Sequence, residues 1–211
     1  MKCVIMISVS LNEIYSETYK ALRSVNIEWS LAKDCANKAK WLAQHGQNFL
    51  GLILKTADLY QKQDITISIN ENTNEKPLAS ALVALLLVEY VSANRITWEG
   101  YIDSTKFLLA AMGIIAEEQH IYLILENEKK ELVAFTKDKT IHVKSNLDTN
   151  IPSYCFLRKY DFIKRKNIKY KSLKKNNDII KLNDKCWDRL QSMAFETYVP
   201  ESEASKSGAG Y

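Results

Sequence analysis

The sequence has little of what makes tight turns and cross-links. Its 211 residues include 6 Gly, 3 Pro and 4 Cys. So few turn formers argue against a sandwich of many short strands. The cysteines stand far apart and form no CxxC pair, so we expect free thiols in a reducing compartment. They are Cys3, Cys35, Cys155 and Cys186.

Long apolar runs are also missing. The longest, Leu78 to Val88, is far shorter than the ~20 residues that a membrane helix needs. The apolar residues 3–7 make too short a stretch for the core of a signal peptide. We therefore expect a cytoplasmic protein that has no membrane partner.

Common chemical motifs are absent as well. The three histidines, His45, His120 and His142, form neither HxH nor HExxH. There is no GxSxG elbow and no glycine-rich phosphate loop of the GxGxxG or GxxxxGK[ST] kind. We therefore expect no metal site and no cofactor. Whether the chain is an enzyme stays open at this stage.

What is present is a set of amphipathic segments typical of a globular protein, with 46% hydrophobic and 26% charged residues. Ser10 and Glu13 make a capping box, while Ser30, Ser104 and Asn183 stand where helix caps are expected. Gly46 is a helix stop. Helical spacing predicts helices over 11–25, 30–45, 49–59, 78–94 (with Pro77 in its first turn), 107–118 and 184–194.

Strand patterns dominate the second half of the chain. Alternation predicts strands over 65–69, 96–101, 120–125, 131–136, 140–143 and 154–160, with 120–143 forming an antiparallel meander. Such segregation predicts an α+β fold: N-terminal helices packed with a mainly antiparallel sheet, and a closing C-terminal helix. We expect a single domain, 1–211. The alternative has two lobes, 1–95 mainly helical and 96–211 with the meander, the last helix and a tail.

A basic stretch with interleaved aromatics occupies residues 158–175. The chain carries a net charge of +4, and this stretch contains much of the excess of Lys and Arg. Cations with aromatics can bind single-stranded nucleic acid. The alternative is a solvated lysine-rich loop whose aromatics face the core. The nucleic-acid candidates are Arg158, Lys159, Lys164, Arg165 and Lys166.

The C-terminal residues 196–210 are dense in hydroxyls and carboxylates. They could form a lid over a pocket with Glu201 or Glu203 as a general base, or simply a frayed terminus.

Both ends of the chain resemble one family. Ser10-Leu11-Asn12-Glu13-Ile14, Trp29-Ser30-Leu31-Ala32 and residues 40–46 (KWLAQHG) are similar to the N-terminus of an uncharacterised proteobacterial family, domain of unknown function 3726. Residues 187–190 (WDRL) and 196–205 (ETYVPESEAS) are similar to its C-terminal signature. The chain differs from it at Lys76, where the family has Cys, and at Tyr211, where the family continues to an acidic end. The resemblance implies a tail with a role, and no activity.

Three hypotheses follow. The first is a non-catalytic accessory protein that binds a small molecule or a protein partner. The second is an enzyme acting on a small metabolite with the tail in its site. The third is nucleic-acid binding through 158–175, and a homo-oligomer is compatible with all three. The candidate ligand-binding residues are Trp41, His45, Glu196, Tyr198, Glu201 and Ser202.

Overall fold

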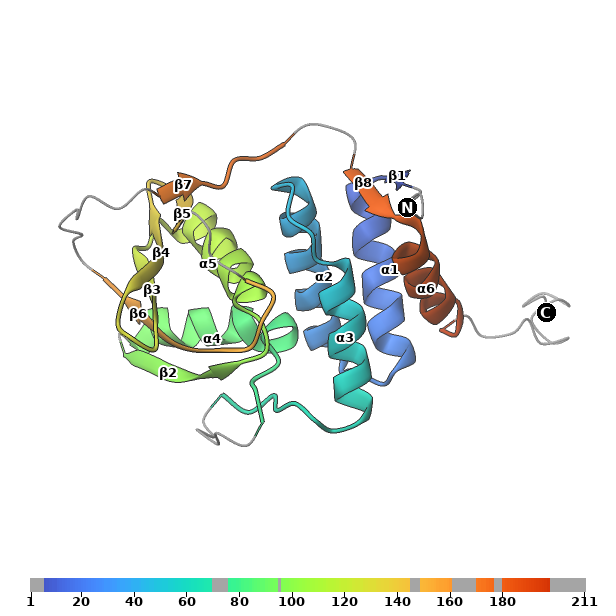
Figure 1. The fold of residues 1–211 in the computed structure, drawn as a ribbon, viewed down its shortest axis with the longest axis horizontal. Coiled ribbons are helices and arrows are strands. Elements are labelled where there is room, and N and C mark those ends of the chain that lie inside the picture. The colour runs from blue at the N-terminus through green and yellow to red at the C-terminus, as the bar shows by residue number, and fades with distance from the viewer. Residues whose placement is uncertain are drawn as a thin grey trace, which may run out of the picture.

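The computed structural model describes residues 6–69, 76–94, 96–144, 149–160, 170–176 and 180–197. A layer of helices packs beside an antiparallel sheet that curves around two further helices (Figure 1). The fold is therefore α+β, as predicted. The helices are α1 (Leu11–Ser24), α2 (Trp29–Gln44), α3 (Leu50–Gln61), α4 (Ser80–Asn94), α5 (Thr105–Gln119) and α6 (Asp184–Phe195). The strands are β1 (Met6–Val9), β2 (Thr97–Ile102), β3 (Leu123–Asn127), β4 (Leu132–Lys137), β5 (Thr140–Lys144), β6 (Ser153–Lys159), β7 (Tyr170–Ser172) and β8 (Ile180–Asn183).

Helix α2 joins the two parts of the molecule. It packs on α1 on one side and on α4 and α5 on the other, and α1 separates it from α6 (Figure 1). Its stripe of small residues explains this position, because Ala32, Cys35, Ala36 and Ala39 are fully buried and let neighbouring helices approach closely. One continuous cluster of buried apolar side chains runs from the helical layer into the sheet.

Most predicted helix ends are confirmed. Ser10 and Glu13 form the capping box of α1, with Ser10 N–H donating to Glu13 Oε2 at 2.8 Å. Ser104 caps α5 and Asn183 caps α6. Gly46 ends α2 in the left-handed region at φ 66°, a conformation that glycine adopts without steric cost.

The start of α2 corrects one detail. Ser30 was expected as the cap, but the Glu28 carboxylate accepts the backbone N–H groups of Ser30 and Leu31 at 2.9 and 3.3 Å. A carboxylate at a helix N-terminus satisfies these donors and favours the positive end of the helix dipole. The helix therefore begins before Ser30, at Trp29.

The strand predicted over 65–69 is wrong. Only Thr66 makes an isolated bridge, to Leu78. Its partner segment begins with Pro77, which has no N–H to donate to a ladder. In addition, the Ser68 N–H donates to Thr66 Oγ1 at 3.2 Å, which turns the backbone instead of extending it.

Pro77 does not open α4, which begins at Ser80. Leu78 is held extended, because its N–H donates to Tyr101 O at 2.8 Å and its carbonyl accepts the Asp103 N–H at 3.1 Å. The Asp103 carboxylate then accepts the Ser80 N–H at 2.9 Å. A carboxylate that is distant in sequence thus caps α4, and no local cap signal could reveal it.

The antiparallel meander β3–β4–β5 is confirmed, and β6 pairs with both β2 and β3. His120 was expected in the first of these strands, but it ends α5 in a left-handed conformation with φ 52°. Strand β3 therefore starts later, at Leu123. The sequence also did not predict β1 and β8, which pair far apart in the chain as an antiparallel ribbon beside α6.

Two further findings concern the described residues. Cys35, Cys155 and Cys186 are free thiols. Across the described ranges, no helix has both the length and the apolar character required to cross a membrane.

Candidate functional site

Trp41 and His45, both predicted as site residues, form a stacked pair at the C-terminal end of α2. Their ring centroids lie 3.7 Å apart. Four residues separate them, so one helical turn places the rings one above the other. Both side chains are largely buried, with Trp41 6% and His45 7% exposed. The helix terminus thus holds a fixed indole and imidazole.

Glu117 of α5 connects this pair to a third segment of the chain. The Trp41 Nε1–H donates to Glu117 Oε1 at 3.0 Å, and Lys175 Nζ donates to Glu117 Oε2 at 2.7 Å. The backbone of Asn176 also donates to Gln44 O at 2.7 Å. Glu117 therefore holds the indole and Lys175, and the backbone of Asn176 attaches the same segment to the end of α2.

Gly113 makes room for the indole. A Cβ at this position would lie 2.3 Å from Trp41 Cζ2 and 2.9 Å from Trp41 Cε2. The ring cannot easily move away, because it stacks on His45 and is hydrogen-bonded to Glu117. The close approach of α5 to α2 therefore requires glycine here.

His45 is held as a neutral side chain. Burial lowers its pKa, although the hydrogen bond to the Trp41 carbonyl and the nearby Glu117 carboxylate act in the opposite direction. Nδ1 lies 2.7 Å from Trp41 O, so Nδ1 carries the proton and donates it to that carbonyl. Nε2 lies 3.9 Å from Glu117 Oε1. The imidazole thus packs against the Trp41 ring and helps to hold it in place.

A groove of about 320 Å³ opens beside Trp41, between α2, α4 and α5. Apolar contact surface comes from Trp41, Leu85 and Ile114. The polar lining combines three carboxylates with one ammonium group and two amides, namely Glu89, Glu117, Glu118, Lys40, Asn37 and Gln44. The groove is therefore part aromatic and part acidic.

The carboxylates of the groove lie close enough to influence one another. Burial raises the pKa of Glu89, and the neighbouring Asp34 and Glu118 carboxylates raise it further. Like charges on one wall disfavour ionisation, so a bound cation would relieve the repulsion. The groove thus has an electrostatic preference for positive charge.

Lys38 lies in the core beside this acidic wall. Its side chain is fully buried, and its ammonium group donates to Leu82 O over a long 3.5 Å. Burial lowers the pKa of Lys38, while Cys35, Asp34 and Glu89 act to raise it. A single long hydrogen bond does not replace the hydration of a charged ammonium group. Lys38 is therefore an internal position at which charge is costly.

The other predicted site residues lie elsewhere. Glu196 follows α6, on the far side of α1 from α2 (Figure 1), and its backbone N–H donates to Met193 O at 3.2 Å. Tyr198, Glu201 and Ser202 fall outside the described residues. The structure thus brings Trp41 and His45 together and does not bring Glu196 to them.

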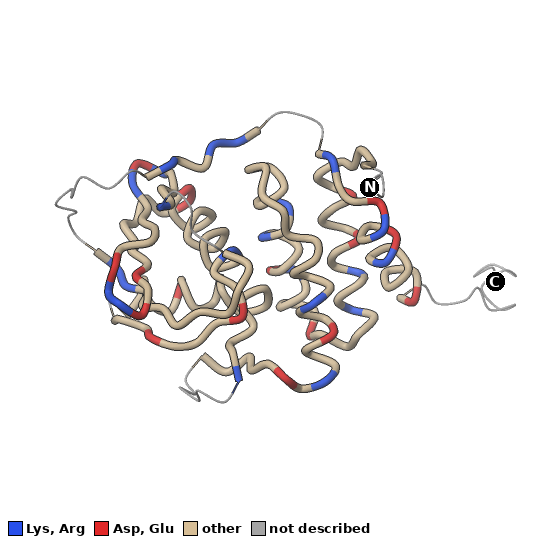
Figure 2. Tube along the Cα trace, in the orientation of Figure 1, with Lys and Arg blue, Asp and Glu red and all other residues tan. Residues whose placement is uncertain are grey.

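Of the nucleic-acid candidates in the basic stretch, two belong to the described residues and three do not. Arg158 and Lys159 end β6, and Arg158 pairs with Glu126 of β3 at 3.1 Å. Lys164, Arg165 and Lys166 lie outside the described part of the chain. Figure 2 shows further basic positions in β7 and in the segment that follows it. In the sequence, Lys171 belongs to β7, and Lys174 and Lys175 follow it.

Among the described residues, no three His, Cys, Asp or Glu side chains are placed to hold a metal ion.

Comparison with known proteins gives little more. No family model matches the chain. No curated protein matches it either. Among solved structures, it is similar to a malate dehydrogenase from Entamoeba histolytica, with a TM-score of 0.45 and 15% identity over 74% of this chain and 50% of that chain. The chain thus spans about half the length of that protein, and a likeness at this level carries no argument about function. The resemblance to domain of unknown function 3726 stays a prediction.

The sequence did not predict Glu117, Glu89 or Lys38 as part of a site. Lys38 stands three residues after Cys35 and four before Leu42, both buried, so its helical spacing already pointed to the core. Glu117 and Glu89 read as ordinary polar positions on apolar helices. Only the packing of α2, α4 and α5 brings them beside Trp41.

Proposed function

We propose that this chain is a non-catalytic accessory protein that binds a small cationic ligand in the groove beside Trp41. The observation that carries the proposal is the acidic lining of a groove whose indole is fixed by Glu117. Carboxylates near an aromatic surface favour a ligand that joins a positive charge to an apolar part.

The size of the groove limits the ligand. Ligand pockets commonly measure roughly 300–1,000 Å³. At about 320 Å³ the groove is near the lower limit, which suits an amine or guanidine of few heavy atoms. Leu85 and Ile114 offer contact for its carbon skeleton, while Glu89 and Glu118 offer counter-charges.

Binding is favoured over catalysis by the position of His45. A general base must reach the proton that it removes. The His45 side chain is 3% exposed and stacks on the Trp41 ring, and its Nδ1 donates to the Trp41 carbonyl. It therefore supports the wall of the groove and does not face a ligand in it. This argument favours the accessory-protein hypothesis over the enzyme hypothesis.

Isothermal titration with simple probes tests the proposal. Benzylamine, putrescine and arginine should bind, while benzoate and succinate should not, because the carboxylates repel anions. Glu118→Gln and Glu89→Gln should each weaken amine binding about tenfold, the effect expected from losing one charged partner.

Glu128→Gln is the matched control. Glu128 belongs to the loop between β3 and β4, remote from the groove, so this variant should bind amines like the parent protein. Equal loss of binding in the control, or binding of the carboxylates in place of the amines, would reject the proposal.

A reducing, cytoplasmic location belongs to the same proposal. It is supported by Cys35 and Cys155, which are free and buried, and burial raises the pKa of each thiol to about 12. Such thiols behave as small apolar side chains and need no oxidising compartment.

A further inference from the structure

Helix α4 has almost no polar side. Its sequence, SALVALLLVEYVSAN, contains a single charged residue, Glu89. A helix that is apolar all round is expected to be buried on every side. One side of α4 nevertheless reaches solvent, where Leu86 is 47% and Tyr90 38% exposed. Exposed apolar surface of this kind is typical of an interaction site.

The exposed residues of α4 form one stripe. Leu86, Glu89, Tyr90 and Ala93 are all exposed, and their spacing of three and four residues places them on the same side of the helix. Leu86 and Tyr90 therefore adjoin Glu89. The stripe offers a partner an apolar surface with a carboxylate beside it.

The solvent-facing side of α2 lies next to this stripe. Trp29 is 60% exposed, and Lys33, one turn further along, is exposed as well. The same side of α2 continues to Asn37, which lines the groove together with Glu89. One helix thus presents an indole and an ammonium group, and its neighbour presents an apolar pair and a carboxylate.

The charges of this surface lack ion-pair partners in the described part of the chain. Neither Lys33 nor Glu89 forms an ion pair there, and neither does Glu118. Asp34 lies on the α4 side of α2, close enough to raise the pKa of Glu89. Lys40 donates to a neutral amide of α1 at 3.3 Å. The surface therefore has an acidic half toward α4 and a basic half toward α1.

A surface with two halves of opposite sign complements a second copy of itself. Under two-fold symmetry, any contact between two residues across the interface occurs twice. An arrangement that places α2 of each copy on α4 of the other brings unlike charges together at both places. A partner of one sign would be attracted by one half and repelled by the other. The second copy also supplies an aromatic ring to cover the apolar stripe.

We propose that this surface is the interface of a homodimer in which Trp29 of each copy packs on Leu86 and Tyr90 of the other. Lys33 of each copy then meets Glu89 of the other. Tryptophan and tyrosine are the residues that most often dominate the binding energy of an interface. The interface shares Glu89 with the groove, so an amine bound there should weaken the dimer.

Sedimentation velocity of the full chain over a range of concentrations tests the inference. The parent protein should show a monomer–dimer equilibrium. Trp29→Ala and Leu86→Ala should each raise the dissociation constant of the dimer about a hundredfold, because each lost contact costs about tenfold and two-fold symmetry repeats it. Both side chains are exposed in the single chain, so both variants should fold normally, which circular dichroism checks.

Charge reversal tests the symmetry of the interface. Lys33→Glu and Glu89→Lys should each abolish the dimer, because like charges then meet at both places. One variant now carries glutamate at both positions and the other carries lysine at both. A mixture of the two should therefore dimerise again. A repair within one chain cannot produce this result, since neither variant contains both signs at these positions.

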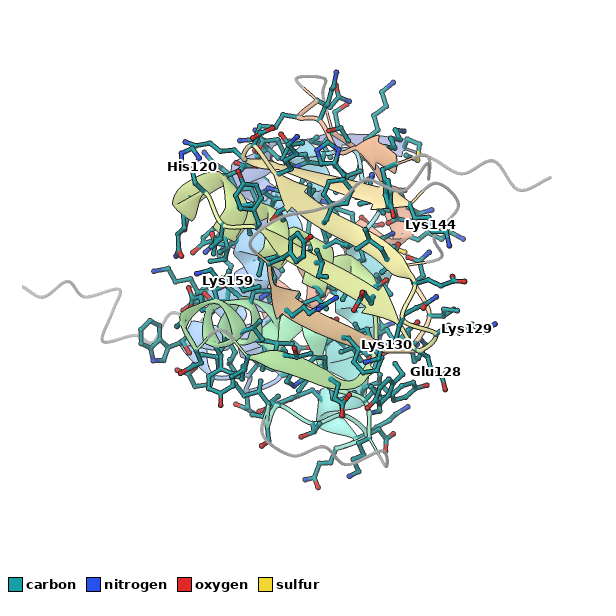
Figure 3. All side chains as sticks on the ribbon, turned by 90° about the vertical axis from the view of Figure 1, so that its left-hand side faces the viewer. His120, Glu128, Lys129, Lys130, Lys144 and Lys159 are labelled. Carbon is teal, nitrogen blue, oxygen red and sulfur yellow. The ribbon has the colours of Figure 1, made fainter. Side chains whose placement is uncertain are left out.

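Two variants serve as matched controls. Met6→Ala changes a side chain that is 51% exposed, but in β1, which pairs with β8 beside α6. Lys129→Glu reverses a charge that Figure 3 shows on the opposite margin of the molecule from His120, the residue that ends α5. Neither should change the dissociation constant. Below that concentration the chain is monomeric, so its unfolding reports the stability of the single chain.

The outcomes separate this inference from the proposed function. A chain that stays monomeric at every concentration would overturn the dimer, even if it binds benzylamine. A dimer that the charge reversals leave intact, or that the mixture fails to restore, would also overturn this interface. A dimer that follows the predicted pattern without binding benzylamine would support the inference and reject the proposed function. Binding of the monomer to phosphatidylcholine vesicles would assign the apolar stripe to a lipid surface instead.

Discussion

The groove beside Trp41 and the face of the six-stranded sheet that points away from α4 and α5, which we call the open face, both combine aromatic rings with charged groups. The two regions differ in how deeply these groups are buried. At the end of α2, Trp41 is 6% exposed and bonded to Glu117, and nearby Lys38 is fully enclosed. On the open face, Tyr122 is 40% exposed and the ion pairs lie at the surface. Substitutions near α2 should therefore change stability more than substitutions on the open face.

The two lysines Lys38 and Lys130 show this difference most clearly. Lys38 has a single long hydrogen bond to a carbonyl in the core. Lys130 lies over the Phe156 ring at the surface of the sheet. A buried ammonium group costs free energy unless it is well paired, while a solvated one costs little. The same residue type thus destabilises the fold in one region and costs little free energy in the other.

The largest effect is expected from Gly113→Ala. The added Cβ would lie 2.3 Å from the Trp41 ring, so α5 or the indole must move. We expect a loss of about 3 kcal/mol in the free energy of unfolding, at the upper end for overpacking. Urea unfolding measures it.

Gly51→Ala is the control for this prediction. Gly51 lies in α3, where an added Cβ would meet nothing within 4 Å. Alanine there should stabilise the protein by about 0.5–1 kcal/mol, because it restricts the unfolded chain and favours the helix. If Gly113→Ala were as stable as Gly51→Ala, the tight contact between α5 and Trp41 would be wrong.

Lys38→Met should stabilise the protein by about 2 kcal/mol at neutral pH, because an apolar chain of similar length replaces a poorly paired ammonium group. The folded-state pKa of Lys38 is lowered from the ordinary value of 10.5. Stability of the parent protein should therefore fall as pH decreases below about 10.5, since the unfolded chain then binds a proton more readily.

The gain from Lys38→Met should accordingly shrink as pH rises toward that value. Lys33→Met, at an exposed position of the same helix, should leave stability within about 0.5 kcal/mol of the parent. A destabilised Lys38→Met would mean that the ammonium group makes a favourable interaction in the core.

Acid sensitivity should come from His45. Its pKa is lowered by burial, so the folded state resists the protonation that the unfolded chain undergoes below its ordinary value of 6.5. Stability of the parent should thus fall as pH decreases from about 7 to about 5. His45→Gln cannot titrate and should show a smaller fall over this range, whatever its stability at neutral pH. An unchanged pH profile would contradict the neutral, buried imidazole.

The smallest effect is expected from Lys144→Gln on the open face. The Lys144–Glu131 pair is 3.2 Å long, but both side chains are substantially exposed. Exposed pairs contribute about 0–1 kcal/mol, so thermal unfolding should hardly change. A large loss would show that charges on this face stabilise the fold, and the contrast between the two regions would fail.

Local signals in the sequence predicted much of this fold. The Ser10–Glu13 capping box, the caps at Ser104 and Asn183 and the stop at Gly46 depend on neighbours in the chain, and all are present. The antiparallel meander was equally local, because its strands follow one another directly.

The failures involve contacts between distant segments. Residues 65–69 have a strand pattern but meet a segment that begins with Pro77. Helix α4 starts where Asp103 supplies a carboxylate, 23 residues away in the sequence. The site shows the same limit: spacing placed Trp41 and His45 together, but only tertiary packing adds Glu117 and Gly113.

The indole N–H resonance of Trp41 reports directly whether the groove beside this residue binds small cations. In a ¹⁵N-labelled sample, Trp41→Phe identifies that resonance among the tryptophan signals. Benzylamine should shift it in a saturable manner, and Glu89→Gln should raise the benzylamine concentration at half of the full shift about tenfold, while benzoate has no effect. An unmoved Trp41 resonance in the presence of benzylamine, or an equal response to benzoate, would contradict cation binding in this groove.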